Sequence, residues 1–355
     1  MSVFPTVQCN YMCIISTNNT PQAYPAMFRG DAQTGGLLFW EPVMEYGKSP
    51  LSLQDQVLLL KSRGLVFDNP QRVTHYLQYI GYYRLSAYWL PYEQISSIDN
   101  KRNHLFQAGT TFDQVLATYI FDRQLRLLVM EAMERIETAI RSLWAHALSV
   151  RHGPHAHMQP SLFKSPWQHA SDIAQMATQL HASRETFICH YRKKYDKPFL
   201  PPIWMVVETL SLGALSRWFQ ATNDNKAKRD VAQSLGMPTV EILEQVLHAL
   251  TPVRNVCAHH GRLWNRRFTL QLPLIKRFKG LIVTEQIANE AGEIQIQATR
   301  QIFNYLVVMA LLMQRIEPGN NWAGRLRQHI QGVTVAQQSL MGCPADWAHW
   351  TVFVD

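Results

Sequence analysis

The sequence predicts an all-α fold, and three observations support this prediction. Several long stretches of the 355-residue chain place apolar side chains three, four and seven positions apart, which is the spacing of one helix face. Residues that cap helices stand before these stretches, and glycines follow several of them. No sustained alternation of apolar and polar residues, the pattern of a half-buried strand, runs through the sequence.

The chain divides into four predicted parts. Residues 1–47 contain proline, glycine, asparagine and threonine without a helical period, which indicates a poorly ordered N-terminal extension to which we assign no function. Residues 48–110 are expected to form an N-terminal helical subdomain, and residues 111–316 the main helical domain. Residues 317–355 are expected to form a C-terminal tail that packs on the main domain.

The N-terminal subdomain is predicted to begin with two helices. Ser52 can cap the first helix and Gly64 can end it, while Asn69 precedes the second. The next segment contains Tyr83 and Arg84, and its mixture of aromatic faces with a cation suits stacking on unpaired bases together with phosphate contact. The alternative is a packing layer in which the tyrosines belong to the core and only their hydroxyls reach water.

One long helix is expected over residues 111–149, because apolar residues recur along it with helical spacing. Its other side carries acidic and basic residues, most of which we interpret as exposed ion pairs one turn apart. The loop that follows contains His152, His155 and His157. These histidines allow a metal site in principle, but the loop offers no carboxylate or thiolate, and we expect no metal.

The segments after this loop are also predicted to be helical. Residues 167–197 are expected to form one basic helix, whose end either follows a nucleic-acid backbone or simply faces solvent. A helix over residues 204–219 should be interrupted near Gly213, and a polar linker should lead to a small helix before Gly236. A last helix, apolar on several sides and therefore buried, is expected over residues 294–315.

The segment 251–265 concentrates arginine, histidine and asparagine directly after an apolar run with helical spacing. Thr239 is expected to cap the helix that carries this segment. Pro252 either lies within the helix and kinks it, or occupies the first position of a new helix that Thr251 caps. In both cases the break falls directly before the polar residues.

In a continuous helix, three of these polar residues share one face: Asn255, His259 and Arg262. Such a set suits chemistry on a phosphodiester, because imidazole moves protons near neutral pH and guanidinium matches the charge and shape of phosphate. No carboxylate lies in the segment, which disfavours a metal-dependent phosphodiesterase at this position. The alternative is a histidine with a structural role only, which is the more common case for a single histidine on a helix.

This segment resembles known proteins. Arg254-Asn255-x3-His259 is similar to the Arg-x4-6-His signature of HEPN ribonucleases. The longer string Arg-Asn-Val-Cys-Ala-His-His-Gly-Arg-Leu-Trp-Asn resembles the Abi proteins of the AbiD/AbiF-like group, which act in bacterial abortive infection. Further segments resemble that family in order: Ile-Gly-Tyr-Tyr-Arg-Leu-Ser-Ala-Tyr, Glu131–Glu137, Pro-Pro-x-Trp and Met341–Trp347. The resemblance runs from residue 48 to near the C-terminus, and it implies a HEPN-like helical bundle.

The resemblance implies a metal-independent endoribonuclease without a cofactor, in which Arg254 and His259 form the catalytic pair. A ribose 2′-oxygen would attack the adjacent phosphate, with His259 as general base or acid and Arg254 holding the charged intermediate. Asn255 would position Arg254 or the phosphate. RNA is the expected substrate, because DNA lacks the 2′-hydroxyl nucleophile.

Other residues are expected to bind RNA or to support the catalytic pair. His260 would point about 100° away from His259 on a helix, so we interpret it as structural or supporting. Arg262 is expected to bind phosphate. The remaining residues in this group are Arg84, Tyr83, Glu134, Arg135, Arg266 and Arg267. Among them, Glu134 or Arg135 would orient the catalytic residues, because the family's corresponding helix packs against the catalytic one.

Composition limits the partners of the chain. The formal net charge of +8 fits a polyanionic partner, but it does not separate RNA from DNA or anionic lipid. Five scattered cysteines without a Cys-x2-Cys pair imply neither a disulfide framework nor a zinc ribbon, which favours a cytoplasmic location. The N-terminus lacks a signal-peptide pattern and the longest apolar run is too short for a bilayer, so we expect no membrane partner.

The resemblance further implies a homodimer, since HEPN sites are typically built across a twofold interface. It also implies a toxin that an inhibitory RNA or protein antitoxin keeps silent until phage attack. Two alternatives remain open. A non-catalytic helical module could bind RNA or a protein through the same basic surface, or a metal-dependent phosphodiesterase could use the histidines of residues 152–157.

Overall fold

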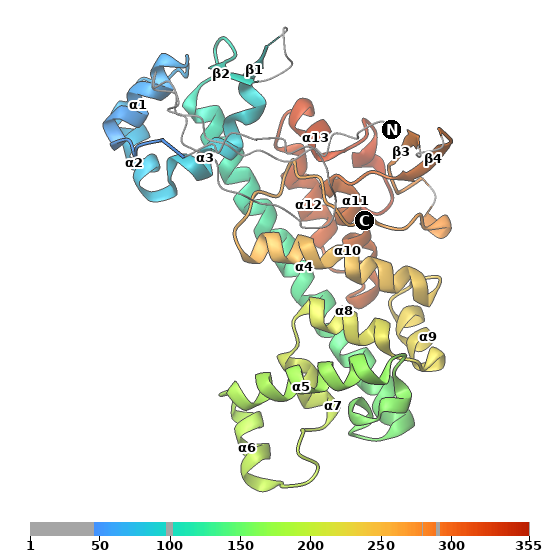
Figure 1. Cartoon of the computed structure of the whole chain (residues 1–355). Helices are drawn as coiled ribbons and strands as arrows, with labels where there is room; N and C mark the ends of the chain where they lie inside the picture. The colour runs from blue at the N-terminus through green and yellow to red at the C-terminus, as the bar shows by residue number, and fades with distance from the viewer. Residues whose placement is uncertain (1–45, 97–101, 279, 289–291, 355) are drawn as a thin grey trace, which may run out of the picture. The chain divides into compact units, whose positions relative to one another are not determined.

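The computed structural model describes residues 46–96, 102–278, 280–288 and 292–354 (Figure 1). The predicted extension, residues 1–47, lies almost entirely outside the described residues. Within the described residues helices predominate, and the strands form two small antiparallel sheets. The fold is therefore mainly helical, as predicted, although the prediction missed both sheets.

The chain divides into two compact units, Met1–Ala117 and Thr118–Asp355. The described elements of the first unit are α1 (Leu53–Ser62), α2 (Pro70–Ile80), α3 (Tyr82–Trp89), the 3-10 helix η1 (Leu90–Tyr92), β1 (Glu93–Ile95), β2 (Arg102–Phe106) and the start of α4 (Phe112–His152). The long helix α4 continues into the second unit, so the predicted long helix is confirmed with a slightly later end.

The first two helices of the first unit begin where their local signals predict. The Ser52 hydroxyl oxygen caps α1 by accepting a hydrogen bond from the Asp55 N–H at 3.1 Å. The Asn69 side chain caps α2 in the same way, accepting from the Arg72 N–H at 2.9 Å. Strands β1 and β2 then pair antiparallel.

The second unit contains most of α4 and the remaining elements. Its other helices and strands are α5 (Pro166–Ala182), α6 (Thr186–Lys194), α7 (Ile203–Val206), α8 (Leu212–Ala221), α9 (Asn225–Ser234), α10 (Val240–Ala258), β3 (Thr284–Ala288), β4 (Ile294–Ala298), α11 (Ile302–Ile316), α12 (Trp322–Gln331) and α13 (Val335–Met341). The 3-10 helices are η2 (Ala156–Met158), η3 (Pro160–Leu162), η4 (Val207–Thr209), η5 (Lys276–Phe278) and η6 (Trp347–His349). In Figure 1, α8 and α10 run across α4, and α5, α6 and α7 lie toward its C-terminal end.

The prediction of one helix over residues 167–197 is wrong, because α5 and α6 are separate helices. The Ser183 hydroxyl accepts a hydrogen bond from the Glu185 N–H at 3.3 Å, and this local bond competes with helix continuation. Arg192 of α6 closes the end of α5 by donating to the carbonyl oxygens of His181 at 2.7 Å and Ser183 at 3.0 Å. A basic residue that looked like part of an exposed face therefore has a structural role.

The predicted start of the last helix at Ile294 is also wrong. Residues from Ile294 form strand β4, which pairs antiparallel with β3 and places Thr284 opposite Ala298. The helix α11 begins only at Ile302. The isoleucines of the strand, Ile294 and Ile296, are exposed, so backbone pairing rather than burial holds it. Hydrophobic spacing alone assigned them to the face of a helix.

Two smaller boundary errors have local causes. The break near Gly213 falls at Leu210–Ser211, where the Ser211 side chain caps α8 and leaves Gly213 inside that helix. A Cβ on Gly213 would lie 3.1 Å from Thr251 Cγ2, so glycine allows α8 to approach α10 closely. The predicted polar linker is instead the start of α9, because Asp224 accepts hydrogen bonds from two of its backbone N–H groups.

The helix α11 is almost entirely buried, as predicted for the last apolar helix. Its one buried amide, Asn304, is satisfied by the backbone of Val283, since its side chain both accepts and donates at 2.8 Å. Among the described residues, each helix is too short or too polar to cross a lipid bilayer.

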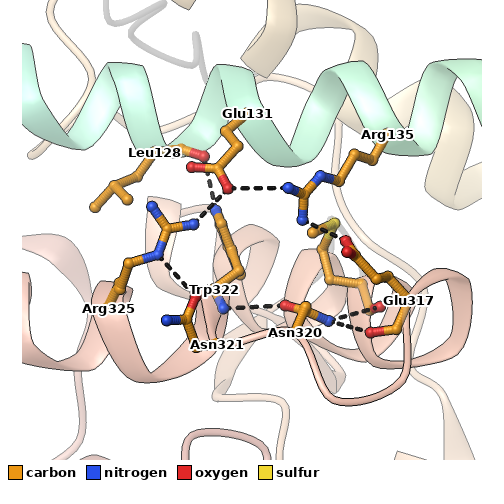
Figure 2. A network of polar contacts seen from close by, with 9 residues as sticks. Leu128, Glu131, Arg135, Glu317, Asn320, Asn321, Trp322 and Arg325 are labelled. Carbon is orange, nitrogen blue, oxygen red and sulfur yellow. Dashed lines mark hydrogen bonds and ion pairs between the residues drawn. The ribbon is translucent and has the colours of Figure 1, made fainter.

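Residues 317–355, expected only as a tail, contain two further helices. A network of hydrogen bonds and ion pairs between α4 and the start of α12 holds this region against α4 (Figure 2). The Trp322 indole N–H donates to the Leu128 carbonyl oxygen at 2.8 Å, and Arg325 pairs with Glu131. Arg135 reaches from α4 to Glu317 at 2.5 Å, so this network joins α4 to the connection between α11 and α12.

Candidate functional site

The polar segment lies on the second half of α10 and the loop that follows. Thr239 caps α10 as predicted, its side-chain oxygen accepting from the Ile242 N–H at 3.3 Å. The helix continues through Pro252 to Ala258, so the alternative of a new helix capped by Thr251 is wrong. Thr251 instead donates its hydroxyl to the Leu247 carbonyl oxygen one turn earlier, at 3.0 Å.

The helix ends at Ala258 with a Schellman motif. His259 is the cap residue, and His260 has a φ of +56°, in the left-handed region. The closing hydrogen bonds run from the His260 N–H to the Cys257 oxygen at 3.0 Å and from the Gly261 N–H to the Val256 oxygen at 2.7 Å. A position that glycine usually occupies therefore carries a histidine, which agrees with the structural interpretation of His260.

The helix ends before Arg262, so the prediction that this arginine shares a helical face with Asn255 and His259 is wrong. The left-handed residue His260 redirects the chain at that point. Asn255 and His259 do lie one turn apart, and both are exposed, whereas Arg262 is partly buried. The structure therefore presents an amide and an imidazole together at the end of α10.

A carboxylate missing from the segment is supplied by α4. Glu137 Oε2 lies 3.6 Å from Arg254 Nε, and the Glu137 carboxylate also accepts a hydrogen bond from Arg141 at 2.5 Å. Arg141 donates further to the Leu210 carbonyl oxygen at 2.6 Å, at the break before α8. Glu137 is buried and pairs with two guanidinium groups, so its charge attracts Arg254 toward α4. Glu137 and Arg141 were not among the site residues predicted from the sequence, although their spacing of four residues was a usable signal.

A second ion pair on α4, between Asp122 and Arg126, holds the loop that follows α10. The carboxylate of Asp122 is fully buried, pairs with Arg126 and accepts the N–H groups of Leu263 at 3.1 Å and Trp264 at 2.8 Å. Arg126 also donates to the Gly261 carbonyl oxygen at 3.2 Å. The backbone that follows His259 is therefore held from one side by a single ion pair of α4.

Several buried polar atoms near this segment have no hydrogen-bond partner among the described residues. They are Arg254 Nε, Trp264 Nε1 and Asn265 Oδ1. Most buried polar groups in native proteins are hydrogen-bonded, so such a concentration marks a region where a bound group or partner would be favourable. Cys257 is not a candidate nucleophile, because burial, reinforced by the charge of Asp122, raises the pKa of its thiol to about 12.

The residues predicted to support the catalytic pair are distributed differently. Glu137, rather than Glu134, contacts Arg254, and Glu134 is exposed. Arg135 pairs with Glu131 and Glu317 in the network of Figure 2, so its contacts are with the α11–α12 connection. Glu134 and Glu137 are three residues apart, about one turn of α4, and the second of them is the one that reaches Arg254.

The predicted RNA-binding residues outside the segment are divided between the two units. Arg266 is exposed, whereas the guanidinium of Arg267 pairs with Glu285 at 3.1 Å. Tyr83 and Arg84 belong to the first unit and are exposed there. Their role in RNA binding stays a prediction.

The three histidines at the end of α4 and in the loop after it have different surroundings, although the His155 and His157 ring centres lie 6.2 Å apart. His152 pairs with Asp224 at 2.8 Å, His155 lies 3.5 Å from the Tyr191 hydroxyl, and His157 is completely buried. In the part of the chain that the structure describes, no three histidine, cysteine, aspartate or glutamate side chains are placed to hold a metal ion.

The fold and this site define a mainly helical protein in which one central helix holds an Arg–Asn–His helix end. The model of the Abi-like protein family matches residues 75–265, which include α4, α10 and the whole polar segment. The match covers more than half of the chain, and the protein therefore belongs to the Abi-like protein family. Membership suggests a role in abortive-infection phage defence. No curated protein and no solved structure gives a significant match.

Proposed function

We propose that this protein is a metal-independent endoribonuclease of HEPN type that acts as a toxin in abortive-infection defence. It would belong to the AbiD/AbiF-like group and have a HEPN-like helical bundle. The observation that supports this most is that the buried Glu137 pairs with Arg254, on the helix end that also carries the exposed Asn255 and His259. Orientation of a permanent cation before substrate binds is what stabilisation of a charged transition state requires.

The proposed reaction needs three functions at one phosphodiester. A base removes the proton of the ribose 2′-hydroxyl, a cation holds the phosphate as charge develops, and an acid protonates the leaving 5′-oxygen. His259 would transfer protons and Arg254 would hold the phosphate, with Asn255 positioning it. The products are a 2′,3′-cyclic phosphate and a 5′-hydroxyl.

A second copy of the chain would complete the site. One exposed imidazole cannot be base and acid in the same step, whereas two copies with adjoining α10 ends would provide one histidine for each task. The exposure of Asn255 and His259 leaves this helix end accessible to such a pairing. In the cytoplasm, an inhibitory RNA or protein antitoxin would keep the toxin silent until phage infection.

The second candidate is a non-catalytic module that binds RNA or a protein. It is favoured by the ion pair between Arg254 and Glu137, since a guanidinium that already has a carboxylate partner is partly neutralised. In that case His259 would be a hydrogen-bonding group only.

The test is cleavage of total RNA by the purified protein in the presence of EDTA. We expect cleavage by the unmodified protein and a loss of at least about 100-fold in both Arg254→Ala and His259→Ala, the range for removal of an acid–base catalyst. The matched control is His181→Ala, the same change on an exposed histidine of α5, and it should keep full activity.

Two results would contradict the proposal: unchanged cleavage by His259→Ala, or cleavage that EDTA abolishes. If the unmodified protein and the two alanine variants bind RNA equally and none cleaves it, the binding module is the better description.

The role of Glu137 has its own prediction. Glu137→Gln removes the charge that holds Arg254, so kcat for RNA cleavage should fall about 10- to 100-fold with a smaller change in KM, as expected when a catalytic group is misplaced. The matched control is Glu134→Gln, the same change on an exposed residue of the same helix, and it should leave kcat unchanged. Equal effects in both variants, with normal thermal stability, would rule out a positioning role.

A further inference from the structure

One exposed stretch outside the α10 site concentrates cations and aromatic rings. Residues 192–199 are all exposed, and they lie between the buried residues Tyr191 and Leu200. The stretch contains Arg192, three lysines and one aspartate, so it carries a net charge of +3. It belongs to the end of α6 and the loop that follows, in the second unit.

The aromatic rings of this stretch are exposed without being loosely attached. Tyr195 is 46% exposed and Phe199 is 62% exposed. The loop between them is bonded to α6, because the Tyr191 hydroxyl donates to the Pro198 carbonyl oxygen at 2.9 Å. Leu200 is buried at its far end. The two rings are therefore presented by a fixed backbone, which lowers the entropy lost when a ligand stacks on them.

One of the lysines lies over one of these rings. The ammonium nitrogen of Lys194 lies 5.3 Å from the centre of the Tyr195 ring, and Lys197 stands between the two aromatic residues in the sequence. Arg192 already donates hydrogen bonds to two carbonyl oxygens at the end of α5. The cations that a ligand would meet are thus those of Lys193, Lys194 and Lys197.

We propose that this basic aromatic surface (Lys193, Lys194, Tyr195, Lys197 and Phe199) binds single-stranded RNA outside the α10 site. Exposed rings with adjacent ammonium groups are the two components of non-specific single-strand binding, where bases stack and phosphates pair. Single-stranded rather than double-stranded RNA fits, because the bases of a duplex are already stacked on one another. The choice of RNA rests on the proposed function, and the surface would retain the substrate while it is cleaved elsewhere.

A lipid membrane fits this surface less well. The two aromatic residues follow the end of α6 in an irregular loop, so they form no extended apolar helix face that could enter a bilayer.

The proposal is tested by binding a fluorescent 2′-O-methyl oligouridine of about 12 nucleotides, a length in the range that one single-strand site covers. This probe lacks free 2′-hydroxyl groups, so the proposed reaction cannot cleave it. Lys194→Ala/Lys197→Ala should weaken binding and reduce the slope of log Kd against log salt by about 1.4, or about 0.7 for each phosphate contact of a single strand. Tyr195→Ala and Phe199→Ala should each weaken binding about tenfold without changing the slope.

Matched controls separate this surface from the general charge of the protein. Lys61→Ala/Lys226→Ala removes two exposed lysines elsewhere, and Tyr79→Ala removes a ring that is 72% exposed. Both controls should bind the probe as the unmodified protein does. Equal losses in control and test variants would overturn the proposal, and so would a loss of binding to vesicles of phosphatidylcholine and phosphatidylserine with oligouridine binding unchanged.

The experiments test the cleavage proposal and the binding proposal separately. His259→Ala should abolish cleavage of unmodified RNA and keep full affinity for the probe, because the two sites are separate. If no protein cleaves RNA but the lysine and aromatic variants still lose affinity, the surface is supported and the nuclease proposal is not. If cleavage is present and the surface variants bind the probe normally, the nuclease proposal is supported and the proposed binding surface is not.

Discussion

Asp122→Ala should lower the free energy of unfolding by about 3–5 kcal/mol, the cost of removing one partner of a buried ion pair. The substitution leaves the Arg126 guanidinium buried without its carboxylate and removes the acceptor of the Leu263 and Trp264 N–H groups. Since these groups hold the loop that follows His259, the proposed RNA cleavage should be lost as well. The measurement is chemical denaturation monitored by circular dichroism, followed by the cleavage assay at a temperature where the variant is folded.

Two further variants identify the cause of this effect. Asp113→Ala makes the same change on an exposed residue of α4 that pairs with Arg72, and it should cost no more than about 1 kcal/mol. Asp122→Leu/Arg126→Met removes both charges and should recover part of the stability, because no buried charge is left unpaired. Recovery of stability without recovery of cleavage would show that the Asp122–Arg126 ion pair positions the loop in addition to stabilising the fold. An Asp122→Ala variant as stable as Asp113→Ala would contradict this role of the ion pair.

The second large effect is a loss of stability in acid that depends on His157. This imidazole is fully buried, and burial, with smaller contributions from the nearby His155 and His169, lowers its pKa from 6.5 to about 3. Neither of its ring nitrogens has a hydrogen-bond partner among the described residues. The folded state therefore keeps His157 neutral, whereas the unfolded state takes up a proton below pH 6.5. Its contribution to stability is complete above pH 6.5 and is lost progressively as the pH falls toward 3.

The expected size is about 1.4 kcal/mol for each pH unit, or about 2 kcal/mol between pH 6.5 and 5. Urea midpoints measured from pH 7.5 to 5 should fall steeply in the unmodified protein. In His157→Phe, which keeps an aromatic ring at the site, the slope should be reduced by the equivalent of one proton. His181→Phe replaces an exposed histidine on α5 and should keep the original slope. A slope that is the same in all three proteins would refute the assignment.

Local sequence signals predicted most of the helical skeleton because they act over a few residues. Side-chain caps at Ser52, Asn69 and Thr239 start helices where they were expected, since each bonds to a backbone N–H two or three positions away. Predictions failed where a second local signal competed with the helical spacing. Ser183 ended a helix within a basic segment, and Ile294 joined a strand that pairs with the strand directly before it in the chain.

The sequence also identified the residues around which the family is recognised, but not their environment. Arg254, Asn255 and His259 were found from a short pattern, and the family match contains all three. Spacing on an ideal helix then misplaced Arg262, because the pattern does not reveal that His260 adopts a left-handed conformation. Catalysis by these residues stays a proposal until cleavage is measured.

The sequence by itself determined that this chain is a mainly helical member of the Abi-like family, because helix formation and family motifs are properties of neighbouring residues. Only the tertiary structure decided which charges meet. Glu137 and Arg254 are far apart in the chain, as are Asp122 and Trp264, and α4 brings both pairs into contact. A buried charge is stable only with a partner, and the packing of helices distant in sequence determines which partner it has.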